Sequence, residues 1–383
     1  MVDKDIIDEL RRVYGSLVYE LIDRLKRPPR RLYMRVNQMK ASRDQILSAL
    51  REAEIQAFPD EYVEEAIFVV LEGPLEVSCD SRGAIVVDDK AANSLLVGAN
   101  LYRPGVVKST GFRRGEILSA YDKHGNLVAC LEAVVDSSQL RLMSSGLVAL
   151  NISSPYRAPR IRELNLYEKG YLYPQSLPSM IASIALSPSK GDLILDMNAA
   201  PGGKTSHIVE LTRGEARVVA VDRPSKMNEL KRNLSRMGLD KYVILLPHDS
   251  RYLDRDVFKP EMFDKIIIDP PCSNLGVRPI SSKPRSMRDV KTLAEYQYQF
   301  IKAATRLLKK GGRLVYSTCT LTFVENEENI WRAVKELGLE SVDPGLNYPF
   351  VEKTRYRGVI SYRFSPLTMD MPGFFIAVLE KRR

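Results

Sequence analysis

Apolar residues near the start of the chain recur every three to four positions, and this spacing predicts one long helix over residues 3–26. Two prolines follow at positions 28 and 29, and proline does not continue a helix. A strand, a helix and a second, apolar strand are predicted next, at 32–37, about 43–53 and 66–71. Together these elements indicate a small α+β domain over residues 1–80.

The pattern changes between residues 81 and 157, where short apolar runs alternate with glycine-bearing turns. Such alternation is typical of strands joined by tight turns. A helix fits only at 88–97, so we expect a compact all-β domain over 81–157. The segment 155–163, PYRAPRIRE, is rich in proline and arginine and is predicted to be the linker that leaves this domain.

Strand-like and helix-like segments alternate over residues 158–383, which indicates a parallel sheet with crossover helices. The predicted fold class is therefore α/β, a doubly wound, Rossmann-like sheet that follows the two smaller domains. The five central strands are predicted at 192–197, 217–222, 243–249, 264–271 and 313–319. The helices between and after them are predicted at 203–212, 225–238, 293–312 and 325–338.

Composition and charge narrow the classes of protein that need to be considered. The chain has 383 residues and a formal net charge of +9, which suits a nucleic-acid partner. Its longest apolar runs are far shorter than the ~20 residues that span a bilayer, so we expect a cytoplasmic protein with no membrane segment. Four cysteines without a CxxC pair, and three histidines, predict neither a disulfide framework nor a metal site. Cys79 and Cys130 are each expected to fill a small core position.

The segment DMNAAPGGKTSHI at 196–208 places a glycine-rich turn between a strand and a helix. Such a turn lets a ligand approach the backbone N–H groups of a helix N-terminus. The spacing fits neither the P-loop nor the GxGxxG motif, so we expect a ligand other than a nucleoside triphosphate. The candidate binding residues are Asn198, Ala199, Ala200, Pro201, Gly202, Gly203 and Lys204.

Aspartates end four successive apolar strands, at Asp196, Asp222, Asp249 and Asp269. Ligands of open α/β sheets bind beyond the carboxyl ends of the strands, and an acid after the second strand commonly accepts ribose hydroxyls. A single strand-end aspartate is often only a turn former. Four at equivalent places favour a binding crevice.

Two cysteines lie at the ends of the last two central strands. Cys272 belongs to DPPCSNLG and Cys319 to STCT. Adjacent strands lie ~4.8 Å apart, so if these two are neighbours both thiols and Asp269 open into one crevice. Taken alone, each cysteine could instead be a buried apolar residue.

The combination resembles the Sun-type, Fmu-like RNA cytosine-5 methyltransferases. The motifs AAPGGKT, DPPCS, STCT and PGFFIA carry the resemblance over about 170–383, and RVN at 35–37 extends it to a small domain related to RNA-recognition folds. The segments GAIVV, VGANLYRPGV and GFRRGE make 81–157 similar to a PUA domain. Asn198 stands where the family usually has cysteine.

The resemblance implies S-adenosylmethionine as cofactor and a role for each site residue. Cys319 would attack cytosine carbon 6, Asp269 would hold ring N3, and Cys272 would assist proton removal and release. The 198–204 loop would cradle the cofactor, with Asp222 at the ribose and Asp249 at the adenine. Lys204 would contact the nucleotide or Asp269.

The resemblance also implies an RNA partner, tRNA methylated near its acceptor end by a monomeric enzyme. A stacked base hides its carbon 5, so the target has to be flipped or unpaired. Basic and aromatic residues are the candidates for contact with RNA. They are Tyr102, Arg103, Lys108, Arg113, Arg114, Arg278, Lys283 and Arg285.

Other functions remain open at this point. A DNA cytosine-5 methyltransferase would use Cys272 as nucleophile, although the STC cysteine and the PUA-like region argue against it. An amino-group methyltransferase would have an aromatic residue where Cys272 stands. A non-catalytic RNA-binding or assembly factor would not need the set of Cys319, Cys272 and Asp269.

Overall fold

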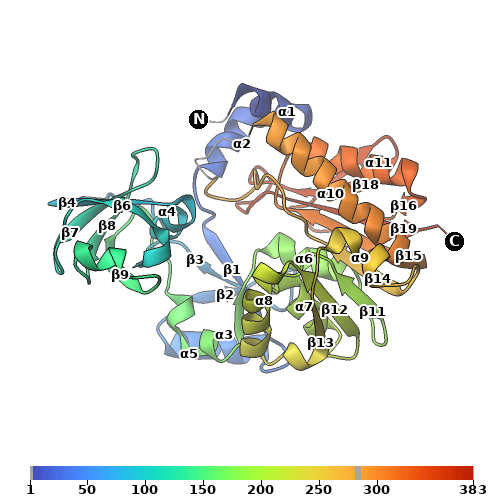
Figure 1. Cartoon of the computed structure of the whole chain (residues 1–383), viewed down its shortest axis with the longest axis horizontal. Helices are drawn as coiled ribbons and strands as arrows, with labels where there is room; N and C mark the ends of the chain where they lie inside the picture. Colours follow the sequence, from blue (N-terminus) through green and yellow to red (C-terminus); the bar gives the residue numbers. More distant parts are fainter. Residues whose placement is uncertain (1–2, 281–285, 383) are drawn as a thin grey trace.

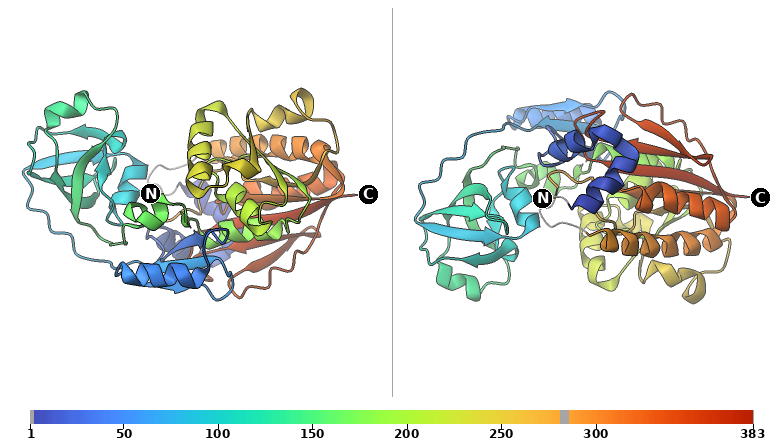
Figure 2. Two further views of the ribbon diagram at one scale, coloured as in Figure 1. Left: turned by 90° about the horizontal axis from the view of Figure 1, so that it is seen from below. Right: turned by 90° about the horizontal axis from the view of Figure 1, so that it is seen from above.

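The computed structural model describes residues 3–280 and 286–382, and its strands form three sheets. Figure 1 shows a small sheet formed mainly by the first part of the chain, a separate all-β unit at one side and a large α/β unit at the other. Both views of Figure 2 keep the all-β unit to one side of the rest. The predicted Lys283 and Arg285 lie outside the described residues.

The first sheet has the strand order β10-β1-β3-β2. The predicted helix over 3–26 is broken, because Gly15 adopts a positive φ of 54° and a 3₁₀ turn separates two helices. The bounds are α1 (Lys4–Tyr14), η1 (Gly15–Leu17), α2 (Val18–Leu25), β1 (Arg31–Val36), α3 (Arg43–Glu52), β2 (Ala57–Pro59), β3 (Ala66–Val70), η4 (Ile161–Glu163), α5 (Asn165–Glu168) and β10 (Leu172–Pro174). Strand β10 pairs with β1, so the predicted boundary at 158 separates it from its own sheet.

The all-β unit has six strands in the order β5-β9-β8-β7-β4-β6 around one apolar core. The expected short helix near residue 90 is present as α4. The bounds are β4 (Gly83–Val87), α4 (Asp89–Leu95), β5 (Leu101–Tyr102), η2 (Arg103–Gly105), β6 (Val106–Ser109), β7 (Ile117–Tyr121), β8 (Leu127–Ala133), η3 (Ser137–Arg141) and β9 (Leu147–Ser153).

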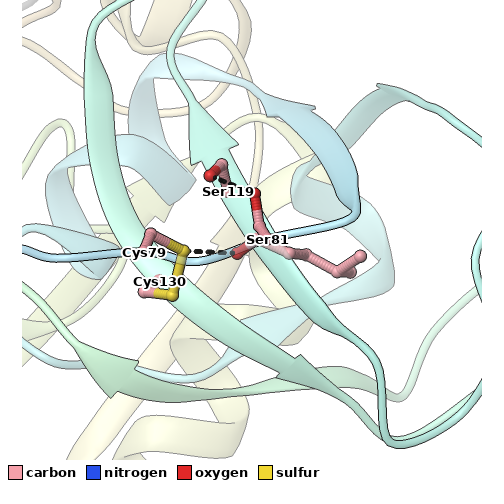
Figure 3. Close-up of a disulfide and its surroundings, with 5 residues drawn as sticks. Cys79, Ser81, Ser119 and Cys130 are labelled. Atoms are coloured by element: carbon pink, nitrogen blue, oxygen red, sulfur yellow. Dashed lines mark hydrogen bonds between the residues drawn. A yellow bond between two sulfur atoms is a disulfide. The ribbon is translucent and has the colours of Figure 1, made fainter.

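Cys79 and Cys130 form a disulfide, so the prediction that each fills a core position singly is wrong (Figure 3). The bond joins the segment that enters the all-β unit to strand β8, across a sequence separation of 51. Ser81 and Ser119 share a hydrogen bond of 2.7 Å beside it. Spacing along the chain gave no signal for this bond, because only the folded sheet brings the two Cα atoms to 5.4 Å.

The large sheet has the order β13-β12-β11-β14-β15-β19-β18-β17, with β16 on β19. Strands β11 to β15 are parallel, and the strands after β15 are antiparallel. The bounds are α6 (Leu177–Ala185), β11 (Leu193–Asp196), α7 (Gly203–Leu211), β12 (Arg217–Asp222), α8 (Pro224–Met237), η5 (Asp240–Tyr242), β13 (Val243–Pro247), η6 (Ser250–Tyr252), α9 (Leu253–Asp256), β14 (Phe263–Ile268), α10 (Met287–Leu307), β15 (Leu308–Thr318), η7 (Val324–Glu328), α11 (Asn329–Glu336), β16 (Leu339–Ser341), β17 (Glu352–Tyr356), β18 (Val359–Phe364) and β19 (Phe374–Lys381).

Helices cover both faces of this sheet, as the predicted doubly wound fold requires. Successive residues of β11 face opposite cores: Ile194 packs with α6, α7 and α8, and Leu195 packs with α10 and α11. Helix α10 ends at Leu307, earlier than the predicted stop at the glycine pair, because Leu308 already begins β15. The predicted last helix starts as a π-helical turn, η7, before α11.

A buried polar cluster joins the first sheet to helix α7. The Arg35 side chain is fully buried and forms an ion pair with Glu210, 2.8 Å from Nε to Oε2. Its guanidinium also donates to the carbonyl oxygen of Gly203 and to Ser206 Oγ, each at 2.7 Å. Because Gly203 begins α7, this cluster fixes the turn that precedes the helix.

Within residues 3–280 and 286–382, no helix is long and apolar enough to cross a bilayer. No group of three or more His, Cys, Asp or Glu residues among them is arranged to hold a metal ion.

Candidate active site

A cavity of about 480 Å³ opens at the carboxyl ends of the parallel strands. This is where open α/β sheets bind their ligands. Its walls come from several loops and from helix α10. The lining residues are Met197, Asn198, Ala200, Asp222, Arg223, Lys226, His248, Asp249, Ser250, Asp269, Pro270, Pro271, Cys272, Asn274, Leu293, Tyr296, Phe300 and Cys319.

The structure brings most of the predicted catalytic and cofactor-binding residues to this cavity, and none of the predicted RNA-contacting residues that the structure describes. Those in its wall are Asn198, Ala200, Asp222, Asp249, Asp269, Cys272 and Cys319. The other predicted loop residues are not part of its lining. They are Ala199, Pro201, Gly202, Gly203 and Lys204.

The glycine-rich loop has a conformation that explains its sequence. Gly202 has φ +109° and stands at the N-cap of α7, a backbone conformation that glycine adopts without strain. A Cβ at this position would also lie 3.0 Å from Leu230. Asp196 is buried and accepts a 2.7 Å hydrogen bond from Thr205, so it braces the loop and does not line the cavity. Burial raises the pKa of Asp196 to about 6.

Asp222 ends β12 and is 7% exposed, with its carboxylate in the cavity wall. The backbone N–H groups of Ala200 and Arg223 donate to it at 3.0 and 2.8 Å. One carboxylate therefore holds the loop and faces the cavity at the same time.

Asp249 is engaged by a neighbouring guanidinium that the sequence reasoning did not include. Arg251 donates to it from Nε and Nη2, the latter at 2.6 Å, and these hydrogen bonds lower the pKa of Asp249. The Arg251 guanidinium also lies 4.5 Å from the ring centroid of Tyr296 in the cavity wall. Beside the predicted Asp249, the cavity therefore also meets the Arg251 guanidinium and an aromatic ring.

The two cysteines meet because β14 and β15 are adjacent parallel strands, as predicted. Their sulfur atoms lie 3.4 Å apart. Asn274 Oδ1 accepts from both thiols, at 3.3 Å from Cys272 Sγ and 3.1 Å from Cys319 Sγ. Asn274 has a positive φ of 59°, which turns the loop so that its amide reaches both sulfurs.

The surroundings of the two thiols differ. Cys272 is buried and Cys319 is half-buried. The hydrogen bond with Cys319, followed by burial, raises the pKa of Cys272 well above its usual value. Beside them, Lys204 Nζ lies 2.5 Å from Asp269 Oδ2, which fulfils one of the two contacts expected for Lys204.

Two of the predicted RNA-contacting arginines are occupied within the protein. The side chain of Arg278 is 4% exposed, and its guanidinium binds Asp370 and the carbonyl oxygens of Arg24 and Arg27. Arg103 donates to the carbonyl oxygen of Leu140 at 2.7 Å. Arg278 thus tethers the loop after Cys272 to helix α2, and its contact with a phosphate stays a prediction. The candidates that remain exposed are Tyr102, Lys108, Arg113 and Arg114.

The family model described as 16S rRNA methyltransferase RsmB/F matches residues 183–380, more than half of the chain. The chain belongs to the RsmB/F methyltransferase family. Models of the PUA domain and of the RsmF/B-like ferredoxin-like domain match residues 83–154 and 4–78.

Relatives within the family match along most of their length. The tRNA (cytosine(72)-C(5))-methyltransferase of Pyrococcus horikoshii is 35% identical over 97% of this chain and 96% of its own. The Homo sapiens enzyme of the same description, NSUN6, is 29% identical over 87% and 79%. A crystal structure of NSun6 from Pyrococcus horikoshii with SFG matches with a TM-score of 0.88 and 32% identity, covering 100% of this chain and 99% of that one.

Membership of the RsmB/F family confirms the predicted resemblance, the α/β fold class and the class of enzyme, an RNA methyltransferase. S-adenosylmethionine is the cofactor of this family, and SFG is an analogue of it. The residues present fit this cofactor. The buried Oδ1 of Asn198 has no hydrogen-bond partner within the described chain, and a donor on a ligand in the cavity would satisfy it.

Sequence reasoning missed several residues of this RsmB/F site. Arg223 and Lys226 follow Asp222 at the start of α8. The expectation that ligands bind beyond the carboxyl ends of the strands could therefore have found them. Tyr296 and Phe300 are spaced by one helical turn, but periodicity alone does not say which face of α10 meets the cavity. Asn274 lies within the DPPCSNLG motif, but an asparagine in a loop carries no functional signal of its own.

Proposed function

We propose that this enzyme methylates carbon 5 of a cytosine near the acceptor end of tRNA, through a covalent bond to Cys319. The observation that carries the proposal is the pair of thiols 3.4 Å apart in the wall of a cavity that also holds Asp269. The substrate rests on the relatives, which are described as tRNA (cytosine(72)-C(5))-methyltransferases.

The glycine-rich loop would hold the cofactor, which when bound would supply an electrophilic methyl group. Asp222 would accept hydrogen bonds from the ribose hydroxyls, and Asn198 would accept one from a donor of the cofactor. Asp249 and Arg251 would form the adenine side together, with Tyr296 as an aromatic wall. Gly202 and Gly203 would let the backbone approach the ligand.

Cys319 is the nucleophile because it is the more exposed thiol. Cys319 gives its proton to solvent and its thiolate adds to carbon 6. The electron pair of the carbon 5–carbon 6 double bond moves to carbon 5, which would take the methyl group of the bound cofactor, and the cofactor's sulfur would leave with the former carbon–sulfur bonding pair as a neutral thioether. Asp269, oriented by Lys204, contacts ring N3 and stabilises the electron-rich adduct.

Cys272 completes the reaction. The hydrogen bond with Cys319 and burial raise the pKa of Cys272, so it is protonated at rest and does not compete for carbon 6. After methyl transfer Cys272 gives its proton to solvent and, as a thiolate, removes the proton from carbon 5; the double bond re-forms and Cys319 leaves as a thiolate.

Substitution of each cysteine tests these roles. Cys319→Ala should be inactive, with no covalent RNA adduct, and should still bind SFG and tRNA. Cys272→Ala should still attack and accept the methyl group, so the product stays bound as a slow band on a denaturing gel. That band should require cofactor and target cytosine, and the double variant should lose it.

The reverse pattern would overturn the assignment. An adduct in Cys319→Ala and none in Cys272→Ala would make Cys272 the nucleophile, as in DNA cytosine-5 methyltransferases. Bisulfite sequencing of treated total RNA checks the substrate. The expected protected cytosine lies at the acceptor end of tRNA, and protection only in ribosomal RNA would contradict the proposal.

The six-stranded PUA domain supplies RNA affinity and placement. Its support is a group of exposed residues with no role in the core, Tyr102, Lys108, Arg113 and Arg114. The backbone N–H groups of the two arginines bind Glu116 and Asp136, at 3.0 and 2.8 Å, so their position is fixed while their side chains face solvent.

Removal of both arginine side chains tests this placement. Arg113→Ala with Arg114→Ala should weaken tRNA binding and flatten its dependence on salt, with SFG affinity unchanged. The matched control is Arg213→Ala with Arg217→Ala, which removes the same charge from two exposed positions at the amino end of β12, the end of the strand away from the cavity. Equal tRNA affinity and salt slope in both double variants would place the RNA path elsewhere.

A further inference from the structure

Glu325 lies behind both cysteine loops, and no step of the mechanism above uses it. It is fully buried in the π-helical turn η7, and it does not line the cavity. A buried carboxylate is costly unless its oxygens are hydrogen-bonded, so its partners indicate its purpose.

Four donors surround the Glu325 carboxylate. Oε1 accepts from the backbone N–H of Ser273 at 2.9 Å and from Gln297 Nε2 at 2.8 Å. Oε2 accepts from Ser273 Oγ at 2.5 Å and from Thr322 Oγ1 at 2.8 Å. The carboxylate therefore holds the loop after Cys272 by both the backbone and the side chain of one residue.

The same contacts continue to the other cysteine. Ser273 Oγ lies 2.6 Å from Thr320 Oγ1, and both hydroxyls are buried. Ser273 follows Cys272 directly and Thr320 follows Cys319. Because Ser273 donates to Glu325, Thr320 donates to Ser273, and the chain of bonds runs from the carboxylate across both loops.

The position of Glu325 is itself fixed from outside the large sheet. Glu9 on α1 is 5% exposed and accepts from the backbone N–H groups of Phe323 and Val324, at 2.9 and 2.8 Å. These N–H groups belong to the start of the turn that carries Glu325. The first helix of the chain thus anchors the turn.

We propose that Glu325 is a positioning residue that holds Cys272 against Cys319 for proton removal and release. The inference rests on the proposed roles of the two cysteines. Cys272 and Cys319 are separated by 47 residues in the sequence. Charge-assisted hydrogen bonds are about twice as strong as neutral ones, so the one carboxylate can fix both cysteine loops. Loss of this hold should slow release more than attack.

The test is Glu325→Gln, with Glu328→Gln as the matched control. Glu328 lies in the same turn, and its side chain is 47% exposed. Glu325→Gln should lower kcat by about 10- to 100-fold, the scale expected for a misplacement near 1 Å. The KM for S-adenosylmethionine should change by less than about 2-fold. The fraction of enzyme trapped as RNA adduct should rise, as in Cys272→Ala, whereas Glu328→Gln should match wild type.

A second variant keeps the test decisive if Glu325→Gln does not fold. Thr320→Val removes only the hydroxyl that links Cys319's loop to Ser273, and leaves the carboxylate with its four donors. It should also lower kcat and raise the adduct fraction at unchanged SFG affinity. Wild-type turnover and adduct levels in Thr320→Val, and in Glu325→Gln where it folds, would overturn the inference. Wild-type enzyme that forms no 5-methylcytosine would instead refute the proposed function, and the inference with it.

Discussion

Replacement of Arg35 by methionine tests how the first sheet supports the cofactor loop. The methionine fills the space of the arginine stem and removes only the guanidinium. In the folded protein all five N–H groups of Arg35 have acceptors, on Glu210, Gln175, Ser206 and the carbonyl oxygen of Gly203. The substitution therefore leaves a buried carboxylate and several acceptors unpaired.

The size of the effect follows from burial. Arg35 and Glu210 have side chains that are 0% and 4% exposed. Removal of one partner of such a pair costs about 3–5 kcal/mol, because the other charge stays buried. For a domain of this size each kcal/mol lowers Tm by about 2–4 °C, so Arg35→Met should lower Tm by roughly 6–20 °C. SFG affinity should fall too, since Arg35 fixes Gly203.

Thermal unfolding followed by circular dichroism, with SFG titration by calorimetry, measures both effects. Arg27→Met is the control, because Arg27 is 66% exposed and its ion pair with Asp23 should contribute less than about 1 kcal/mol. The double variant Arg35→Met with Glu210→Met should recover much of the lost stability. A single variant as stable as the control, or a double variant no better than the single, would refute the reasoning.

Three further measurements address other parts of the molecule. Asp222→Ala should weaken SFG binding in calorimetry by about tenfold or more, the loss of one charge-assisted hydrogen bond; unchanged affinity would remove Asp222 from the site. Cys79→Ser with Cys130→Ser should destabilise the PUA domain by about 4 kcal/mol for a loop of this length, with SFG affinity unchanged. Burial, then Arg35, lowers the pKa of His207 to about 4, so the unfolded chain takes up a proton between pH 6.5 and 4 that the folded protein does not. Buried Asp196, with its pKa of about 6, acts in the opposite direction over almost the same pH range, so the effect of His207 is measured as a difference between two proteins. Between pH 6.5 and 4 the wild type should lose up to about 3 kcal/mol of unfolding free energy relative to His207→Gln, and an equal pH dependence in both proteins would contradict this.

The order and type of most central elements could be predicted because they depend on local features. Consecutive apolar residues such as Ile194 and Leu195 mark a strand that is buried on both faces. The turn at Gly202 needs glycine for its positive φ. The motifs that follow the strands also placed Cys272 and Cys319 in one crevice, because the ends of adjacent parallel strands meet at one edge. These inferences need only the residues that are close along the chain, or the general rule that the carboxyl ends of parallel strands form the binding edge of a sheet.

Other features were decided only by the tertiary structure, because they join residues that no local pattern connects. Arg35 lies 175 positions from Glu210, and Ser273 lies 52 positions from Glu325. The sequence around Cys130 is that of any buried cysteine, and only the folded structure shows that Cys79 lies beside it. A side chain's partners depend on which faces of distant elements pack together, and the hydrophobic pattern fixes the faces without fixing which polar groups meet between them.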